Sequence, residues 1–205
     1  AALASLLEAG AMPKLKELGL NRNQIGEAGM AALASAVRGG ALPSCTYIDL
    51  GDNPGSAAPV QEALAQRHLE QLRSGGAAAE AEELSFTELK WSDADGVALV
   101  GALRAAHERG GLQQPEKLSL FNNQMGDETA AALASLLEAG AMPKLERLDL
   151  DRNRIGEAGM AALASAVRGG ALPSCTYIDL GDNPGSAAPV KEAAAQREGM
   201  EVDDW

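Results

Sequence analysis

The sequence predicts an α/β solenoid that curves into an arc, with six parallel strands on its concave side and α-helices on its convex side. Three observations lead to this fold class. A nine-residue frame, apolar at its first, fourth and sixth positions, occurs six times; successive frames start 30 to 36 residues apart; and an apolar stripe with helical spacing follows most of them. A period of roughly 20–50 residues is typical of repeat proteins, in which stacked neighbouring units bury a continuous core.

The six frames start at residues 15, 45, 81, 115, 145 and 175. Their apolar and polar residues alternate, which is typical of a strand with one buried face. The inward positions are therefore expected to be almost fully buried, among them Leu18, Leu20, Leu148 and Leu150. The frame at 81–89 ends in Leu89, whereas the ninth residue of the other five is an asparagine: Asn23, Asn53, Asn123, Asn153 and Asn183.

A helix is predicted after each frame. The first complete one has an apolar stripe at every fourth residue and stops at a glycine pair: Ile25, Gly29, Leu33, Val37 and Gly39-Gly40. The second helix is predicted from about Ser56, a favourable N-cap, to about Arg73. Segment 74–82 is rich in Gly and Ala and is predicted to be a mobile loop. The next helix is predicted to start at Ser92 or Asp93, after a core Trp91.

The frame Leu-x-x-Leu-x-Leu-x-x-Asn resembles the leucine-rich repeat, and the resemblance covers nearly the whole chain. Segment 25–34, Ile-Gly-Glu-Ala-Gly-Met-Ala-Ala-Leu-Ala, is similar to the ribonuclease-inhibitor-like subfamily, which includes repeat domains of NOD-like receptors and the Ran GTPase-activating protein. This resemblance implies horseshoe-shaped units of strand and helix, with the asparagine side chains bonded to backbone groups in the turns. It also implies a scaffold for protein recognition, without naming what is bound.

One leucine-rich repeat domain is predicted over residues 1–205, with a partial repeat at 1–14 and a capping helix followed by a frayed tail at 186–205. The chain starts inside a repeat without a methionine, so we expect it to be part of a larger protein or assembly. No run of about 18 apolar residues and no signal peptide occur, which predicts no membrane insertion. Cys45 and Cys175 occupy inward positions, and free buried thiols indicate an intracellular, cytoplasmic setting.

The net charge of −12 disfavours nucleic acid and anionic membranes as partners. The motifs of nucleotide-binding loops, zinc proteases and serine hydrolases do not occur, so the sequence predicts neither an enzyme nor a cofactor or metal. The alternative is a GTPase-activating type of repeat protein or another enzyme regulator. That function requires a catalytic side chain presented at a loop, for which Arg22 and Arg152 have the reach.

Residues 1–60 and 131–190 are nearly identical, with differences at five positions: Lys16/Glu146, Glu17/Arg147, Gly19/Asp149, Asn21/Asp151 and Gln24/Arg154. The first four pairs fall at outward strand positions, which line the concave face of a horseshoe. Exposed helix positions such as Glu27/Glu157 and Arg38/Arg168 are unchanged. The concave face is therefore predicted to be the functional surface. Charge reversals on the helix side, at Glu27 and Glu157, are expected to have little effect on partner binding.

The concave face, defined as the outward positions of the frames, contains more acids than bases. The 12 acids are Glu17, Asp49, Asp52, Glu82, Glu83, Glu88, Glu116, Glu146, Asp149, Asp151, Asp179 and Asp182, and the 5 bases are Lys16, Arg22, Lys117, Arg147 and Arg152. Aromatic residues among acids favour a basic protein partner. The predicted partner-binding residues are Glu17, Tyr47, Asp49, Asp52, Phe121, Glu146, Arg147, Asp149, Asp151, Tyr177, Asp179 and Asp182.

Overall fold

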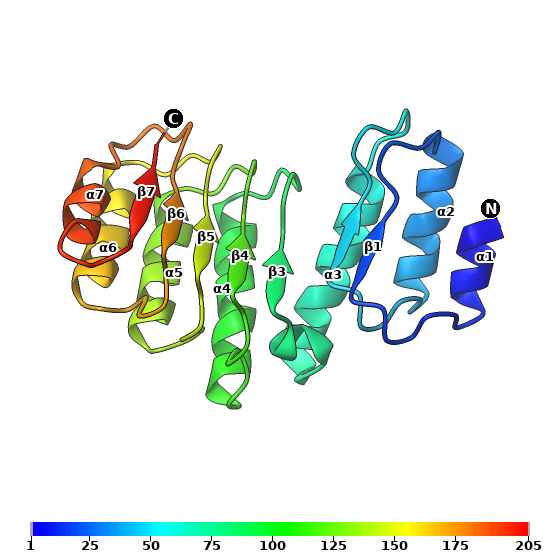
Figure 1. The fold of residues 1–205 in the computed structure, drawn as a ribbon, viewed down its shortest axis with the longest axis horizontal. Helices are drawn as coiled ribbons and strands as arrows, with labels where there is room; N and C mark the ends of the chain where they lie inside the picture. The colour runs from blue at the N-terminus through cyan, green and yellow to red at the C-terminus, as the bar shows by residue number, and fades with distance from the viewer. Residues whose placement is uncertain (1, 205) are drawn as a thin grey trace.

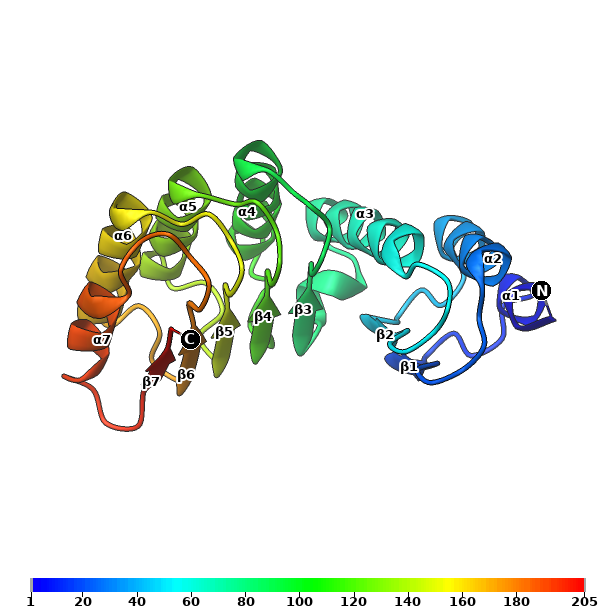
Figure 2. The same cartoon turned by 90° about the horizontal axis from the view of Figure 1, so that it is seen from above.

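The computed structural model describes residues 2–204, apart from the side chain of Ala77. The chain is an α/β solenoid that curves into an arc, with parallel strands on the inner side and helices on the outer side (Figures 1 and 2). Its elements are α1 (Ala2–Glu8), β1 (Glu17–Gly19), α2 (Glu27–Arg38), β2 (Tyr47–Asp49), α3 (Ala58–Ser74), the 3-10 helix η1 (Ala77–Glu80), β3 (Glu83–Ser85), α4 (Asp93–Glu108), β4 (Lys117–Ser119), α5 (Asp127–Glu138), β5 (Arg147–Asp149), α6 (Glu157–Arg168), β6 (Tyr177–Asp179), α7 (Ala188–Ala194) and β7 (Glu201–Asp203).

The described strands form two sheets, β1-β2 and β3-β4-β5-β6-β7, instead of one row of six. In both sheets the middle residue of each strand is apolar, and these residues are in register across the sheet: Leu18 with Ile48, and Leu84, Leu118, Leu148, Ile178 and Val202 in turn. Because side chains alternate between the two faces of a strand, these residues point toward the helices and their neighbours line the concave face.

The prediction of a frayed tail was wrong, because residues 201–203 form the seventh strand. The amide of Glu201 donates to the carbonyl of Thr176 at 2.8 Å, and the amide of Leu180 donates to the carbonyl of Asp203 at 2.9 Å. Met200 and Val202 pack against the larger hydrophobic core. The segment is too short and too polar to show an alternating pattern, so its pairing with β6 comes from the open edge of that strand.

The predicted asparagine ladder is confirmed, and it joins successive repeats. The side-chain amide of Asn153 donates to the carbonyl of Leu120 in the preceding repeat at 2.9 Å and to that of Leu150 at 3.0 Å. Its side-chain oxygen accepts from the amide of Met125 at 3.2 Å. The same links to the preceding repeat are made by Asn53, Asn123 and Asn183. Asn23 bonds only carbonyls of its own turn.

A carboxylate at the start of one helix forms a second link, to the start of the next repeat's helix. These links join Glu27 to the amide of Ser56 (2.9 Å), Asp93 to that of Gly126 (2.7 Å), Asp127 to that of Gly156 (2.6 Å) and Glu157 to that of Ser186 (3.0 Å). Carboxylates are favourable there because the amides at a helix start lack partners within the helix. Glu27 and Glu157 are exposed but hydrogen-bonded, so reversing their charge would break a structural link. That such reversals have little effect on partner binding stays a prediction.

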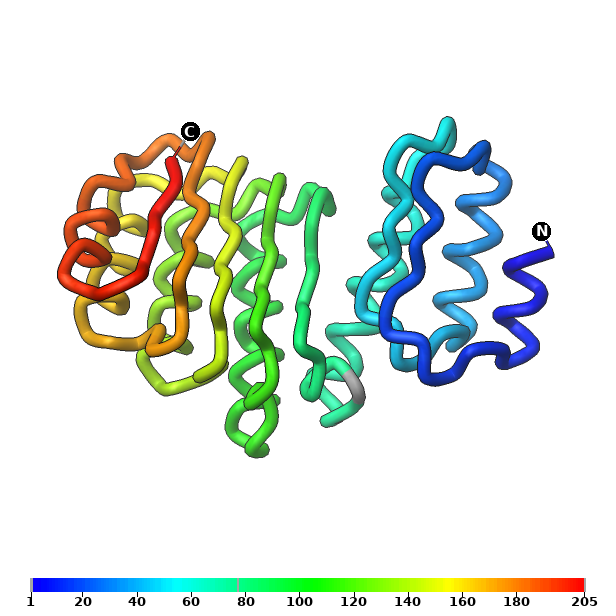
Figure 3. The backbone as a smooth tube through the Cα atoms, in the orientation of Figure 1, coloured from blue at the N-terminus to red at the C-terminus, as the bar shows by residue number. Residues whose placement is uncertain are grey.

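The junction between β2 and β3 lacks both links in the described part of the chain. Leu89 occupies the asparagine position and has no amide to bond the preceding turn. The first turn of α3 contains Pro59 and no acidic residue. The sheet is interrupted at this junction, and Figures 1 and 3 show the backbone crossing it through α3 and the segment that follows.

Helix α3 holds the two parts together on the convex side. Its first half contributes Val60 and Leu64 to the smaller core, and its second half contributes Leu69 and Leu72 to the larger one. Between them, the buried ring of His68 meets the ring of Phe86 edge-on, with centroids 6.0 Å apart. The interruption therefore affects the strand side only, while the helix side remains packed.

Several local predictions can be compared with the structure. Leu148 and Leu150 are 0% and 2% exposed, as expected. Leu18 and Leu20 are only half-buried, because within residues 2–204 their repeat is preceded by no helix other than the seven-residue α1. Segment 74–82 is not a mobile loop: its residues 77–80 form η1, and its buried residues are Ala78, Ala79 and Ala81.

Other local predictions are confirmed. The start of α4 has a capping box in which the backbone amide of Ser92 donates to the side chain of Asp95 at 2.9 Å. Trp91 is buried beside Phe86, with ring centroids 5.6 Å apart. Both cysteines are free and buried, and burial raises the pKa of each thiol.

Candidate functional site: the concave face and its central cleft

The twelve predicted site residues all lie on strands or directly next to them, but in two groups. Glu17, Tyr47, Asp49 and Asp52 belong to the sheet of β1 and β2. The group around the larger sheet consists of Phe121, Glu146, Arg147, Asp149, Asp151, Tyr177, Asp179 and Asp182. The interruption between β2 and β3 separates the two groups, which sequence spacing alone did not indicate.

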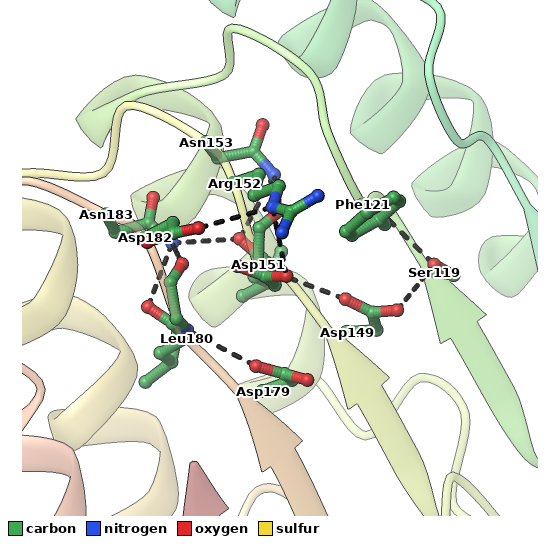
Figure 4. A network of polar contacts seen from close by, with 12 residues as sticks. Ser119, Phe121, Asp149, Asp151, Arg152, Asn153, Asp179, Leu180, Asp182 and Asn183 are labelled. Atoms are coloured by element: carbon green, nitrogen blue, oxygen red, sulfur yellow. Dashed lines mark hydrogen bonds and ion pairs between the residues drawn. The ribbon is translucent and has the colours of Figure 1, made fainter. Parts of the chain in front are cut away.

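A row of aspartates ends the strands of the concave face. Each accepts a hydrogen bond from the backbone amide two residues later: Asp49 from Gly51 at 3.0 Å, Asp149 from Asp151 at 3.3 Å and Asp179 from Gly181 at 3.2 Å. The hydroxyl of Ser119 also donates to Asp149 at 3.0 Å, as Figure 4 shows. These bonds hold each carboxylate in a fixed position: Asp149 and Asp179 lie side by side on β5 and β6, and Asp49 lies on β2 of the smaller sheet.

The carboxylates of Asp149 and the nearby Asp151 lie in surroundings that disfavour their negative charge. Burial raises the pKa of Asp149, and the nearby Asp179 adds to the effect, while the bond from Ser119 opposes it. Burial likewise raises the pKa of Asp151, again with a contribution from Asp179. Closely spaced acids repel one another. A cation placed against this row would therefore be stabilised by several carboxylates at once.

Arginine side chains in the turns reduce part of the acidic excess. The guanidinium of Arg152 lies 3.2 Å from Asp182, and that of Arg22 lies 3.3 Å from Asp52. Arg152 also lies over the ring of Phe121, 5.5 Å from its centroid (Figure 4). Exposed ion pairs of this kind contribute little stability, about 0–1 kcal/mol, so a partner can rearrange them.

Tyr47 and Tyr177 come from identical sequence, but their surroundings differ. The hydroxyl of Tyr177 donates to Asp203 of β7 at 3.1 Å, and the guanidinium of Arg147 lies 4.4 Å from its ring centroid. Loss of contact with water and the adjacent Asp179 raise the pKa of Tyr177 to about 12. Tyr47 lies next to the interruption and is 37% exposed. Tyr47 is therefore the more accessible aromatic contact of the pair.

A cleft of about 540 Å³ opens on the concave face at the interruption. It brings together five of the predicted residues from both groups, namely Tyr47, Asp49, Phe121, Arg147 and Asp149. Glu83, Glu88 and Lys117 also line it; they were predicted on the concave face but not among the partner-binding residues, and Ser119, which lines it too, was in neither set. The substitution of Leu89 for asparagine, together with the 36-residue step before this repeat, is the sequence signal that marks its position.

No other type of site stands out in the described chain. Within residues 2–204, no group of three or more His, Cys, Asp or Glu side chains is arranged to hold a metal ion. None of the helices in that range combines the length and apolar character needed to cross a bilayer. The geometry therefore supports binding by surface contacts along the concave face and its cleft.

The comparison with protein-family sequences agrees with the repeat architecture. A sequence model of the leucine-rich repeat matches residues 11–34 and 141–164. A solved structure, an internalin (inlF) from Listeria monocytogenes, is similar over 99% of this chain with 19% sequence identity and a TM-score of 0.46. The match covers 49% of the internalin chain, so this chain spans about half of its length. A comparison with curated proteins found no match.

Proposed function

We propose that this leucine-rich repeat protein is a recognition module whose concave face binds a basic protein partner. The observation that carries the proposal is the row of aspartates on adjacent strands, in which burial raises the pKa of Asp149 and Asp151. A lysine or arginine of a partner would offset the repulsion among these carboxylates and with Asp179. Such complementarity mainly accelerates association and selects the partner.

Aromatic residues on the same face supply apolar contact area. Tyr47 is exposed, and Phe121 is partly buried beneath Arg152. Tyrosine and arginine are enriched among the residues that dominate binding energies at protein interfaces. An acidic face with such contacts fits a protein surface better than it fits a small polar ligand.

The internal duplication also supports the concave face. Of the five differences between residues 1–60 and 131–190, four fall at concave positions: Lys16/Glu146, Glu17/Arg147, Gly19/Asp149 and Asn21/Asp151. The fifth pair is Gln24/Arg154, just beyond the asparagine of the turn. The two sections therefore share the residues that pack the core but present different charges to a partner. This difference suits a module that contacts two distinct regions of its partner.

The proposal includes a binding rather than a catalytic role and an intracellular, cytoplasmic setting. The free, buried thiols of Cys45 and Cys175 suit a reducing compartment. The two arginines considered for a GTPase-activating role, Arg22 and Arg152, are each paired with an aspartate of the following repeat. That pairing supports a structural position in the turn, and no catalytic role is assigned to them.

Selection from a displayed library of random linear peptides tests the proposal. We expect the full chain to enrich lysine- and arginine-rich peptides. With a selected peptide, Asp149→Lys combined with Asp179→Lys should slow association and weaken its salt dependence, because the attraction is electrostatic. Tyr47→Ala should instead accelerate dissociation, because it removes contact area. Rates can be followed by surface plasmon resonance.

The matched control places lysine on the convex side. Glu108 and Glu138 are exposed last residues of α4 and α5. Lysine is compatible with a helix C-terminus, so Glu108→Lys with Glu138→Lys should leave the fold and the binding rates unchanged. Enrichment of acidic peptides, or loss of binding in this control with normal binding in the strand-side variants, would contradict the proposal.

A further inference from the structure

The interruption of the sheet leaves two strand edges facing each other. At the other junctions the amide after each strand donates to the next strand, as from Leu20 to Asp49 at 2.8 Å and from Leu150 to Asp179 at 2.9 Å. The equivalent bond from Leu50 to Ser85 is absent in the described structure. Both edges are therefore open to an additional strand, a common mode of peptide recognition.

The repeat pattern identifies the backbone groups on these edges. In a strand, alternate residues direct their amide and carbonyl to the same side. In β2, the amide of Tyr47 donates to the carbonyl of Lys16, so the backbone groups of Tyr47 face β1. The groups of Ile48 and Leu50 therefore face the gap. On β3, Glu82 and Phe86 bond to the next repeat, so the groups of Glu83 and Ser85 face the gap from the other side.

The side chains around the gap have two distinct characters. On the concave side the cleft is lined by four acids, Asp49, Glu83, Glu88 and Asp149, against the two bases Lys117 and Arg147. Arg147 is directed over the ring of Tyr177. Adjoining the cleft, a smaller hollow of about 20 Å³ shares Ile48 and Ser85 with it and adds the apolar side chains of Leu64, Phe86 and Leu89.

We infer that the cleft receives an extended, basic segment of the protein partner, which lies between β2 and β3 and pairs with both edges. This inference rests on the proposed function and specifies how part of the partner binds. Alternate side chains of a strand point to opposite faces. The segment should therefore alternate lysine or arginine, directed at the carboxylates, with small apolar residues such as alanine or valine, directed at the shallow hollow.

The size of the cleft and the gaps in the repeat pattern agree with this occupant. Its 540 Å³ lies within the range of about 300–1,000 Å³ that is typical of ligand pockets. The asparagine and carboxylate links found at the junctions β1-β2, β3-β4, β4-β5 and β5-β6 are missing here because of Leu89 and the acid-free first turn of α3. The sequence therefore keeps the strands apart while α3 holds the convex side together.

A short peptide of alternating lysine and valine with blocked ends is the probe for this inference. We expect it to bind the full chain and to slow hydrogen exchange at the amides of Ile48, Leu50, Glu83 and Ser85. The same peptide with N-methylated valine amides keeps its charge but loses donors to one edge. It should bind at least about tenfold more weakly. A glutamate–valine peptide of the same length should not bind.

Two variants test the site from the protein side. Ser85→Pro removes a gap-facing amide without changing charge, which an edge strand tolerates, and it should weaken the lysine–valine peptide about tenfold. Leu89→Asn restores the missing asparagine and should close the junction, so that the peptide no longer protects Ile48 and Ser85. If Leu89→Asn fails to fold, Ser85→Pro still tests the inference, with exchange at Leu118 and Leu148 reporting an intact fold.

The outcomes separate this inference from the proposed function. Equal affinity for the N-methylated peptide, or protection confined to amides of β5 and β6, would overturn strand insertion while basic peptides still bind the concave face. If neither the lysine–valine peptide nor any lysine-rich library peptide binds, both ideas fail. Binding that is lost in Ser85→Pro but kept in Asp179→Lys, whose carboxylate does not line the cleft, supports the cleft as a site of its own.

Discussion

Equivalent residues of the two near-identical sections differ in burial, and this difference shows what each side chain contributes. Asn153 is 6% exposed and bonds the preceding repeat as well as its own turn. Asn23 occupies the same place in its frame, with different residues at 21 and 24, but it is exposed, and within residues 2–204 only α1 precedes its repeat. The same residue at the same place in the frame therefore has a different energetic role.

This pair gives a matched prediction. Asn153→Ala removes donors from three carbonyls and leaves the amide of Met125 without its acceptor, which should cost about 1–3 kcal/mol or more. Asn23→Ala should cost clearly less, because water replaces its bonds. Equilibrium denaturant unfolding of both variants measures the difference. Equal losses would show that the link to the preceding repeat is not what the asparagine contributes.

His68 predicts a pH dependence of stability. Burial, and then the neighbouring Arg67, lower the pKa of His68 to about 4. An unfolded histidine titrates near pH 6.5, so below that pH the unfolded chain binds a proton that the native imidazole does not bind until about pH 4. The contribution is therefore fully present above about pH 6.5 and is lost as the pH falls toward 4. It amounts to about 3 kcal/mol at most.

The His68 prediction can be isolated by difference. Unfolding of the wild type and of His68→Gln is measured at neutral pH and near pH 5, so that carboxylates common to both proteins cancel. The wild type should lose more stability on acidification than the variant. His107→Gln, at the partly exposed end of α4, serves as the control. Parallel pH curves for wild type and His68→Gln would contradict the assignment.

At the scale of elements, β7 protects the exposed end of the larger sheet. It supplies the carbonyl of Asp203 to Leu180 and a carboxylate to the hydroxyl of Tyr177. An unpaired strand edge is a template for unwanted pairing with other chains. The polar strand β7 therefore covers the edge of β6, and its own sequence is unfavourable for pairing with other chains.

Ending the chain after Met200 should expose that edge. Hydrogen exchange at Leu180 should accelerate, and the pKa of Tyr177 should fall from about 12, because burial and the Asp203 interactions that raise it are reduced. Spectrophotometric titration of the tyrosines measures the second effect. Asp204→Ala removes only the exposed ion pair with Lys191 and should change neither quantity. An unchanged pKa in the truncated chain would show that β7 does not pack on Tyr177.

At the scale of the whole molecule, the interruption divides the described core into two clusters of unequal size. The smaller contains 15 buried apolar residues and the larger contains 42. Stability in repeat proteins is the sum of repeat and nearest-neighbour terms, so a weak junction permits one part to unfold before the other. The part before the junction has the smaller core and should unfold first.

Met30 and Met160 provide the test, since both are 0% exposed at equivalent positions in α2 and α6. Met30→Ala should accelerate hydrogen exchange in α2 with little change in α5 and α6. Met160→Ala should destabilise the larger part and leave α2 much less affected. Exchange measured in mild denaturant by mass spectrometry distinguishes the two parts. If both variants accelerate hydrogen exchange equally in α2, α5 and α6, the two parts unfold together as one cooperative unit.

The sequence by itself determined the repeat architecture, because the frame and the helical stripes encode which residues face the core. It also determined which residues line the concave face and which asparagines lie in the turns, since these depend on fixed positions within each repeat. Leu148 and the buried cysteines followed from the same periodicity. Such features depend on residues within one repeat, and the same sequence pattern recurs in each repeat.

Only the tertiary structure decided where the repeats fail to join and what covers each end. The interruption of the sheet before the repeat of Leu89 depends on links between repeats. The sequence of a single frame does not show whether such links form. The half-burial of Leu18, the pairing of β7 and the contrast between Tyr47 and Tyr177 all depend on which neighbour is present. Periodicity specifies what a residue faces within its own repeat, whereas its energy and accessibility depend on the repeat packed against it.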